Sequence, residues 1–154
     1  MFDAPVETWY LWAGLATVSV VALGLAASLP RTPPPDAQGV AQSVDTVAAS
    51  DRSAAAVHPS LAEAVRIGPY RIWLRSDGAT SDATFAYGPV TPVKRGTLLW
   101  DVLHGTPPEE VFDSSAAFRR AAAEARDRKP EWQSRADVIA RKVSWEGVDV
   151  TLVG

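Results

Sequence analysis

Hydrophobic residues divide the chain into an apolar N-terminal segment and a longer remainder of mixed polarity. The segment from Trp9 to Leu29 holds 16 apolar residues out of 21 and no charged side chain. A helix of this length is about 30 Å long at ~1.5 Å per residue, which matches the hydrocarbon core of a bilayer. Trp9, Tyr10 and Trp12 gather at one end, as interfacial aromatic residues do. The pattern predicts a single transmembrane helix over residues 9–29.

The same segment has two other interpretations, a cleaved signal peptide and a buried helix of a soluble protein. The tail before it, residues 1–8, carries Asp3 and Glu7 but no basic residue, which is unlike a signal peptide. We therefore expect an uncleaved signal anchor in the lipid bilayer of the cell membrane. Arg31 is the one basic residue near either end and points to a cytoplasmic C-terminal domain. The Pro-rich spacer that follows favours the extracytoplasmic side slightly more.

A stripe of small residues follows one face of the predicted membrane helix: Ala13, Thr17, Gly24 and Ser28. At 100° per residue they lie within about 60° of one another. Small side chains let a second helix approach closely, so the stripe predicts contact with another membrane helix. The alternative is that the stripe reflects only the common use of small residues in such segments.

Residues 30–57 are predicted to form a Pro/Ala/Ser-rich linker or stalk. Three consecutive prolines begin at Pro33 and favour a stiff, extended chain. After Asp36, a suitable helix cap, Val40, Val44 and Val47 recur at helical spacing. A weak helix and a disordered spacer are both compatible with this segment.

Residues 58–154 are predicted to form a small α+β domain with an antiparallel sheet of two hairpins packed on helices. The first hairpin has strands at 65–75 and 82–90, with Pro69 as an edge or bulge position. The second has strands at 136–145 and 148–153 around a tight turn at Glu146-Gly147. Between the hairpins, capping and apolar spacing predict helices over residues 97–104, from 106, and from 113 or 114 to about 129.

Composition excludes several chemistries. The chain has no cysteine and no asparagine, so disulfides, thiolate sites and N-linked glycans are excluded. Its net charge of -3 is not that of a nucleic-acid-binding protein. His58, His104 and the Glu109-Glu110 pair form no catalytic or metal-binding motif, and structural roles explain them better. The sequence therefore predicts no catalytic, cofactor-binding or metal-binding residue.

Four tryptophans in the predicted domain are unusual for its size: Trp73, Trp100, Trp132 and Trp145. Core packing is the ordinary explanation. Exposed tryptophans would instead mark a protein interface. We keep all four as candidate interface residues.

Three stretches resemble small uncharacterised membrane-anchored proteins of halophilic archaea: MFDAPVETWYLW from Met1, YGPVTPV from Tyr87, and VSWEGVDVTLVG from Val143. The resemblance covers essentially the whole chain and implies an association with pilus-type secretion gene clusters. It implies no catalytic residue. The chain lacks the basic leader and peptidase site of pilins, so we do not expect a processed pilin subunit.

These features together predict a membrane-anchored, non-catalytic accessory or structural protein. It would act through protein–protein contacts in a surface or secretion assembly, with another membrane helix or an envelope or secretion protein as its partner. Two alternatives remain, a membrane-tethered hydrolase and a module that binds a small ligand. Carboxylates gathered in one cleft would favour the first. A closed apolar pocket lined by the tryptophans would favour the second.

Overall fold

The computed structural model describes residues 6–28, 33–135 and 137–154. The chain forms two compact units, residues 1–33 and residues 34–154. The first contains one helix, and the second is an α+β domain with two four-stranded sheets. The α+β class of the prediction is therefore confirmed for the second unit.

Helix α1 (Val6–Ser28) forms the first unit. Thr17 Oγ1 donates a hydrogen bond to the carbonyl of Ala13 at 2.8 Å. None of the helices among residues 6–28, 33–135 and 137–154 combines the length and the apolarity that crossing a membrane requires. This finding contradicts the predicted transmembrane helix at 9–29, and with it the single-pass signal anchor and the membrane localisation.

Helix α2 (Ala37–Ala48) lies inside the predicted linker and belongs to the domain. The predicted cap is confirmed, because the Asp36 carboxylate accepts a hydrogen bond from the Gly39 amide at 2.8 Å. At the other end Lys142 Nζ donates to the carbonyls of Ala48, at 3.0 Å, and Ser50. The buried face of α2 consists of Ala37, Val40, Ala41, Val44 and Val47. The helical alternative for this stretch is therefore the one that the structure shows, because its valines reach a core.

The first sheet has the strand order β1-β7-β8-β5. Its strands are β1 (Ala54–Pro59), β7 (Asp137–Trp145), β8 (Val148–Val153) and β5 (Thr91–Pro92). The β7–β8 hairpin is confirmed, and Glu146 and Gly147 have φ values of 48° and 77°, as a tight two-residue turn requires. Strand β1, whose first four residues fall within the predicted linker, pairs antiparallel with β7. Strand β5 pairs parallel to β8.

The second sheet has the order β4-β3-β2-β6 and differs from the predicted first hairpin. Its strands are β4 (Ala79–Thr84), β3 (Arg71–Ser76), β2 (Ala64–Ile67) and β6 (Trp132–Gln133). The predicted strand 65–75 is wrong, since the Gly68 amide bonds the Arg71 carbonyl at 2.9 Å and turns the chain between β2 and β3. The strand predicted at 82–90 ends at Thr84.

Three helices precede the second hairpin, near the positions that the sequence predicts. They are α3 (Leu98–Leu103), α4 (Pro108–Val111) and α5 (Ser115–Asp127). Ser114 caps α5 by accepting a hydrogen bond from the Ala117 amide at 3.2 Å. Phe118, Ala122 and Ala125 form its buried face.

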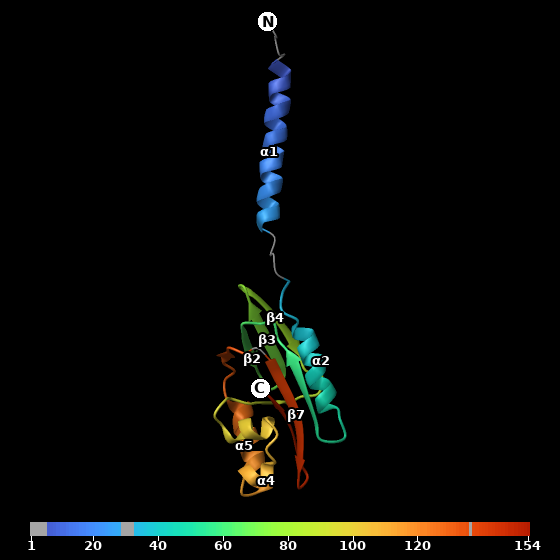
Figure 1. Cartoon of the computed structure of the whole chain (residues 1–154), viewed down its shortest axis with the longest axis vertical. Coiled ribbons are helices and arrows are strands. Elements are labelled where there is room, and N and C mark those ends of the chain that lie inside the picture. Colours follow the sequence, from blue (N-terminus) through green and yellow to red (C-terminus); the bar gives the residue numbers. More distant parts are fainter. Residues whose placement is uncertain (1–5, 29–32, 136) are drawn as a thin grey trace. The chain divides into compact units, whose positions relative to one another are not determined.

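The first sheet separates two hydrophobic cores because its strands present alternate residues to opposite sides. On β7, Val138 and Ala140 join a core that contains α2 and the inner face of the second sheet. Val143 joins the other core, together with α3, α5 and Phe112. Figure 1 shows α2 beside β4 and β7, with α4 and α5 grouped elsewhere on the domain. Within the described part of the domain, no helix packs on the outer face of the second sheet.

Candidate interaction site

Arginine and tryptophan side chains alternate across the outer face of the second sheet. The strand register places Asp82, Trp73, Arg66 and Trp132 side by side on β4, β3, β2 and β6. These positions alternate with buried residues of the same strands, such as Ile72. The row therefore lies on the side of the sheet away from the core. We call this row, with Arg71 and Arg75 of β3, the Arg–Trp face.

Arg66 is the centre of the Arg–Trp face. Its guanidinium carbon lies 4.2 Å from the ring centroid of Trp73 and 4.8 Å from that of Trp132. Arg75 adds a second cation above Trp132, at 4.7 Å. Such stacking stabilises the charge by ~0.5–2 kcal/mol per contact. The Nε atom of Arg66 is buried without a hydrogen-bond partner, so the rings hold this arginine more than polar contacts do.

Gly68 lies beside the Trp73 ring. A β-carbon at this position would lie 3.4 Å from the Trp73 ring and 3.4 Å from the ring of Pro130, at the near limit of ordinary van der Waals contact. The turn that ends β2 therefore borders the Arg–Trp face.

The Arg–Trp face is positively charged, in contrast to the chain. It holds three arginines against one aspartate, whereas the whole chain has a net charge of -3. Arg71 and Asp82 form an ion pair at 3.4 Å, with about half of each side chain exposed. A pair this exposed contributes little to stability. The face thus combines aromatic surface with a local excess of positive charge.

The other two candidate tryptophans lie elsewhere. Trp145 packs against the core that contains α3, α5 and Phe112, which we call the second core. Its ring lies 6.2 Å from that of Phe118. Trp100 packs against the same core. The structure thus brings Trp73 and Trp132 together and leaves Trp100 and Trp145 outside the Arg–Trp face.

Trp100 belongs to a second arginine–tryptophan cluster, which is structural. Arg95 and Arg135 lie 5.3 and 5.0 Å from its ring centroid. Arg135 Nη2 donates to the Val93 carbonyl at 3.0 Å and to Gln133 Oε1 at 2.6 Å. Burial, and then the charge of Arg95, lower the pKa of Arg135. These hydrogen bonds join the segment before α3 to the segment before β7.

The histidines have structural contacts. His58 Nδ1 lies 3.0 Å from Ser43 Oγ and connects β1 to α2. His104 Nδ1 lies 2.8 Å from the Trp100 carbonyl at the end of α3. Glu109 and Glu110 are exposed in the first turn of α4, as helix capping predicts. The described part of the chain contains no group of three potential metal ligands.

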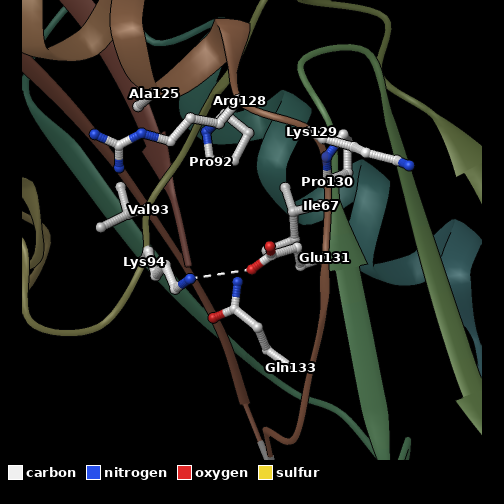
Figure 2. Close-up of a pocket in the computed structure, with 10 residues that line it drawn as sticks. All are labelled: Ile67, Pro92, Val93, Lys94, Ala125, Arg128, Lys129, Pro130, Glu131 and Gln133. Atoms are coloured by element: carbon white, nitrogen blue, oxygen red, sulfur yellow. Dashed lines mark hydrogen bonds and ion pairs between the residues drawn. The ribbon is translucent and has the colours of Figure 1, made fainter.

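Two open cavities are lined by none of the residues of the Arg–Trp face. The first, of about 250 Å³, lies between the end of α5 and the segment around β5, and Figure 2 shows Lys94 and Glu131 pointing toward each other across it, 3.0 Å apart. The second, of about 220 Å³, lies beside Arg141 and the loop after α3. Each is lined by one carboxylate, Glu131 or Glu109, and neither by a tryptophan. Neither therefore has the features that would favour the hydrolase or the ligand-binding alternative.

The small-residue stripe lies on α1. Ala13 and Thr17 are exposed on this helix. Gly24 and Ser28 belong to it as well, but their surroundings lie outside the described part of the structure. The predicted contact of this stripe with another helix stays a prediction.

The fold and the Arg–Trp face define a small α+β domain whose most distinctive surface is a sheet face. The chain belongs to a family described as a family of unknown function, DUF7283, which it matches over residues 3–143. No curated protein and no solved structure matches it. The resemblance to proteins of halophilic archaea near pilus-type gene clusters stays a prediction.

Proposed function

We propose that this protein is a non-catalytic accessory or structural component of a larger assembly, and that it binds a partner protein through the Arg–Trp face. The observation that carries the proposal is a sheet face with two tryptophans and three arginines, on which no helix of residues 33–135 and 137–154 packs. Tryptophan and arginine are the residue types that dominate the binding energy of protein interfaces. That the assembly is a surface or secretion system is suggested by the sequence resemblance alone.

Charge indicates the chemistry of the partner. The face carries Arg66, Arg71 and Arg75 against Asp82, so an acidic segment would meet complementary charge. Trp73 and Trp132 are only partly buried and offer apolar contact at the centre of the face. Thr80 and Thr84 on β4 provide an exposed polar rim. An apolar centre with a polar rim is the usual anatomy of an interface.

Site-specific photo-cross-linking in native cells tests this proposal. A photoreactive residue replaces Thr80, at the rim of the Arg–Trp face, and in a matched control it replaces the exposed Ala123 on α5. We expect one recurring protein adduct from position 80 that is absent from position 123. Arg75→Glu should abolish that adduct, because it reverses a charge on the face. No adduct from position 80, or the same adducts from both positions, would contradict the proposal.

A further inference from the structure

The free edge of β1 is a second surface of interest, because its backbone groups are unpaired on one side. Ile139 exchanges two hydrogen bonds with Gly154, at 2.7 and 2.9 Å, so its backbone points away from β1. Backbone direction alternates along an antiparallel ladder. The backbone N–H and C=O groups of Val138, Ala140 and Lys142 therefore point toward β1. Their register partners on β1 are His58, Ala56 and Ala54.

The alternate residues of β1, Ala55 and Val57, consequently direct their N–H and C=O groups away from β7. No other strand in the described part of the chain pairs with this side of β1. Pro59 belongs to the same outward set, where its missing N–H costs no bond within the sheet. The Val57 side chain is 62% exposed. The edge is thus an open template for another strand.

The other sheet edges are less suited to pairing with a copy of themselves. The Phe85 amide bonds the Tyr70 carbonyl at 2.9 Å, so alternation directs Thr80, Asp82 and Thr84 of β4 outward. Antiparallel pairing of β4 with a second β4 around an axis at Asp82 would place two carboxylates opposite each other, which is unfavourable. Strands β5 and β6 have two residues each and offer short edges.

Strand β1 differs because residues 54–59 contain no Asp, Glu, Lys or Arg. A second copy of this sequence therefore brings no like charge to the edge. We propose that two copies of the chain associate by antiparallel pairing of their β1 strands around a two-fold axis at Ala56. This arrangement keeps the pairing within β1 and places Ala55 of each copy opposite Val57 of the other, so both outward N–H groups of each copy find a carbonyl.

Single-cysteine variants of the full chain test the register directly, since the natural sequence has no cysteine. At the axis, the two Ala56 Cα atoms would be ~4.5 Å apart, within reach of a disulfide. Ala56→Cys should therefore oxidise to a covalent dimer. Ala54→Cys is the matched control, because Ala54 is also partly buried against the core but would lie about 14 Å from its copy. Equal cross-linking of the two variants, or none from Ala56→Cys, would overturn the proposal.

Proline substitutions test the edge without cysteine. Val57→Pro removes an outward N–H and leaves the β1–β7 bonds intact, and Thr84→Pro makes the same change at the β4 edge. By sedimentation equilibrium we expect twice the chain mass for the natural protein and for Thr84→Pro. We expect at least tenfold weaker association for Val57→Pro. A natural chain that stays monomeric, or association of Val57→Pro equal to that of the natural chain, would contradict the proposal.

Discussion

The two arginine–tryptophan clusters use the same side chains in different surroundings. Trp100 packs against a hydrophobic core, and Arg135 beside it is fixed by hydrogen bonds to Val93 and Gln133. Trp73 and Trp132 pack against neither core, and between them Arg66 leaves its Nε without a hydrogen bond. The contrast shows that the residue pair alone does not reveal a role. Contact with the core marks a structural cluster, and its absence marks a surface that a partner could use.

The largest expected difference is between tryptophans. Trp145→Ala removes a ring packed on the second core and should lower the free energy of unfolding by ~3 kcal/mol, as core aromatic truncations do. Trp132→Ala removes only a surface stack and should cost about 1 kcal/mol. Urea denaturation of both variants measures the difference. Equal losses would mean that the Arg–Trp face is itself part of the core.

Arg135 should matter more for stability than Arg75. Arg135→Ala removes charged hydrogen bonds to Val93 and Gln133 and should cost about 2 kcal/mol. Arg75→Ala is the matched control, because this exposed arginine also stacks on a tryptophan but its side chain has no hydrogen bond in the described structure. It should cost less than about 1 kcal/mol by the same denaturation assay. The reverse order would contradict the assignment of the two clusters.

A double-mutant cycle on Arg66 and Trp73 should give a coupling energy of about 1 kcal/mol, because the stacked pair lies at 4.2 Å and is partly removed from water. The variants are Arg66→Met, Trp73→Leu and the double substitution, each measured by urea denaturation. A coupling energy near zero would show that the stacking of Arg66 on Trp73 does not stabilise the folded protein.

The smallest stability effects should come from the exposed ion pair beside each cluster. Asp82→Asn and Glu131→Gln break the pairs with Arg71 and Lys94, and each should change the free energy of unfolding by less than about 0.5 kcal/mol. The affinity for an acidic partner should distinguish the two variants. Asp82→Asn makes the Arg–Trp face more positive and should tighten binding of an acidic partner, whereas Glu131→Gln should not. Equal effects on partner affinity would argue against an electrostatic role for the face.

Local patterns predicted the elements that local contacts determine. The Glu146-Gly147 hairpin, the Asp36 cap and the buried face of α5 all follow from residues close in sequence. The turn at Gly68 was missed although a signal was present. The large buried residues change from odd to even positions between Ile67 and Ile72, and a regular strand without a bulge cannot do this.

Other features depend on pairing between distant segments. Half of strand β1 is alanine, which has a low strand propensity, and the strand exists because it pairs with β7 about 80 residues later. The Arg–Trp face likewise requires Trp132 of β6 to align with Arg66 of β2. The predicted domain contains four of the six tryptophans, but no local pattern could tell which two would meet across strands.

Hydroxyl-radical footprinting, which labels exposed tryptophans, tests the central claim most directly. Labelling is compared between the purified chain and the protein in intact native cells. If the Arg–Trp face binds a partner, Trp73 and Trp132 should be labelled several-fold less in cells, while Trp100 and Trp145 are unchanged. Equal labelling of Trp73 and Trp132 in both settings would contradict the claim that this face is where the protein meets its partner.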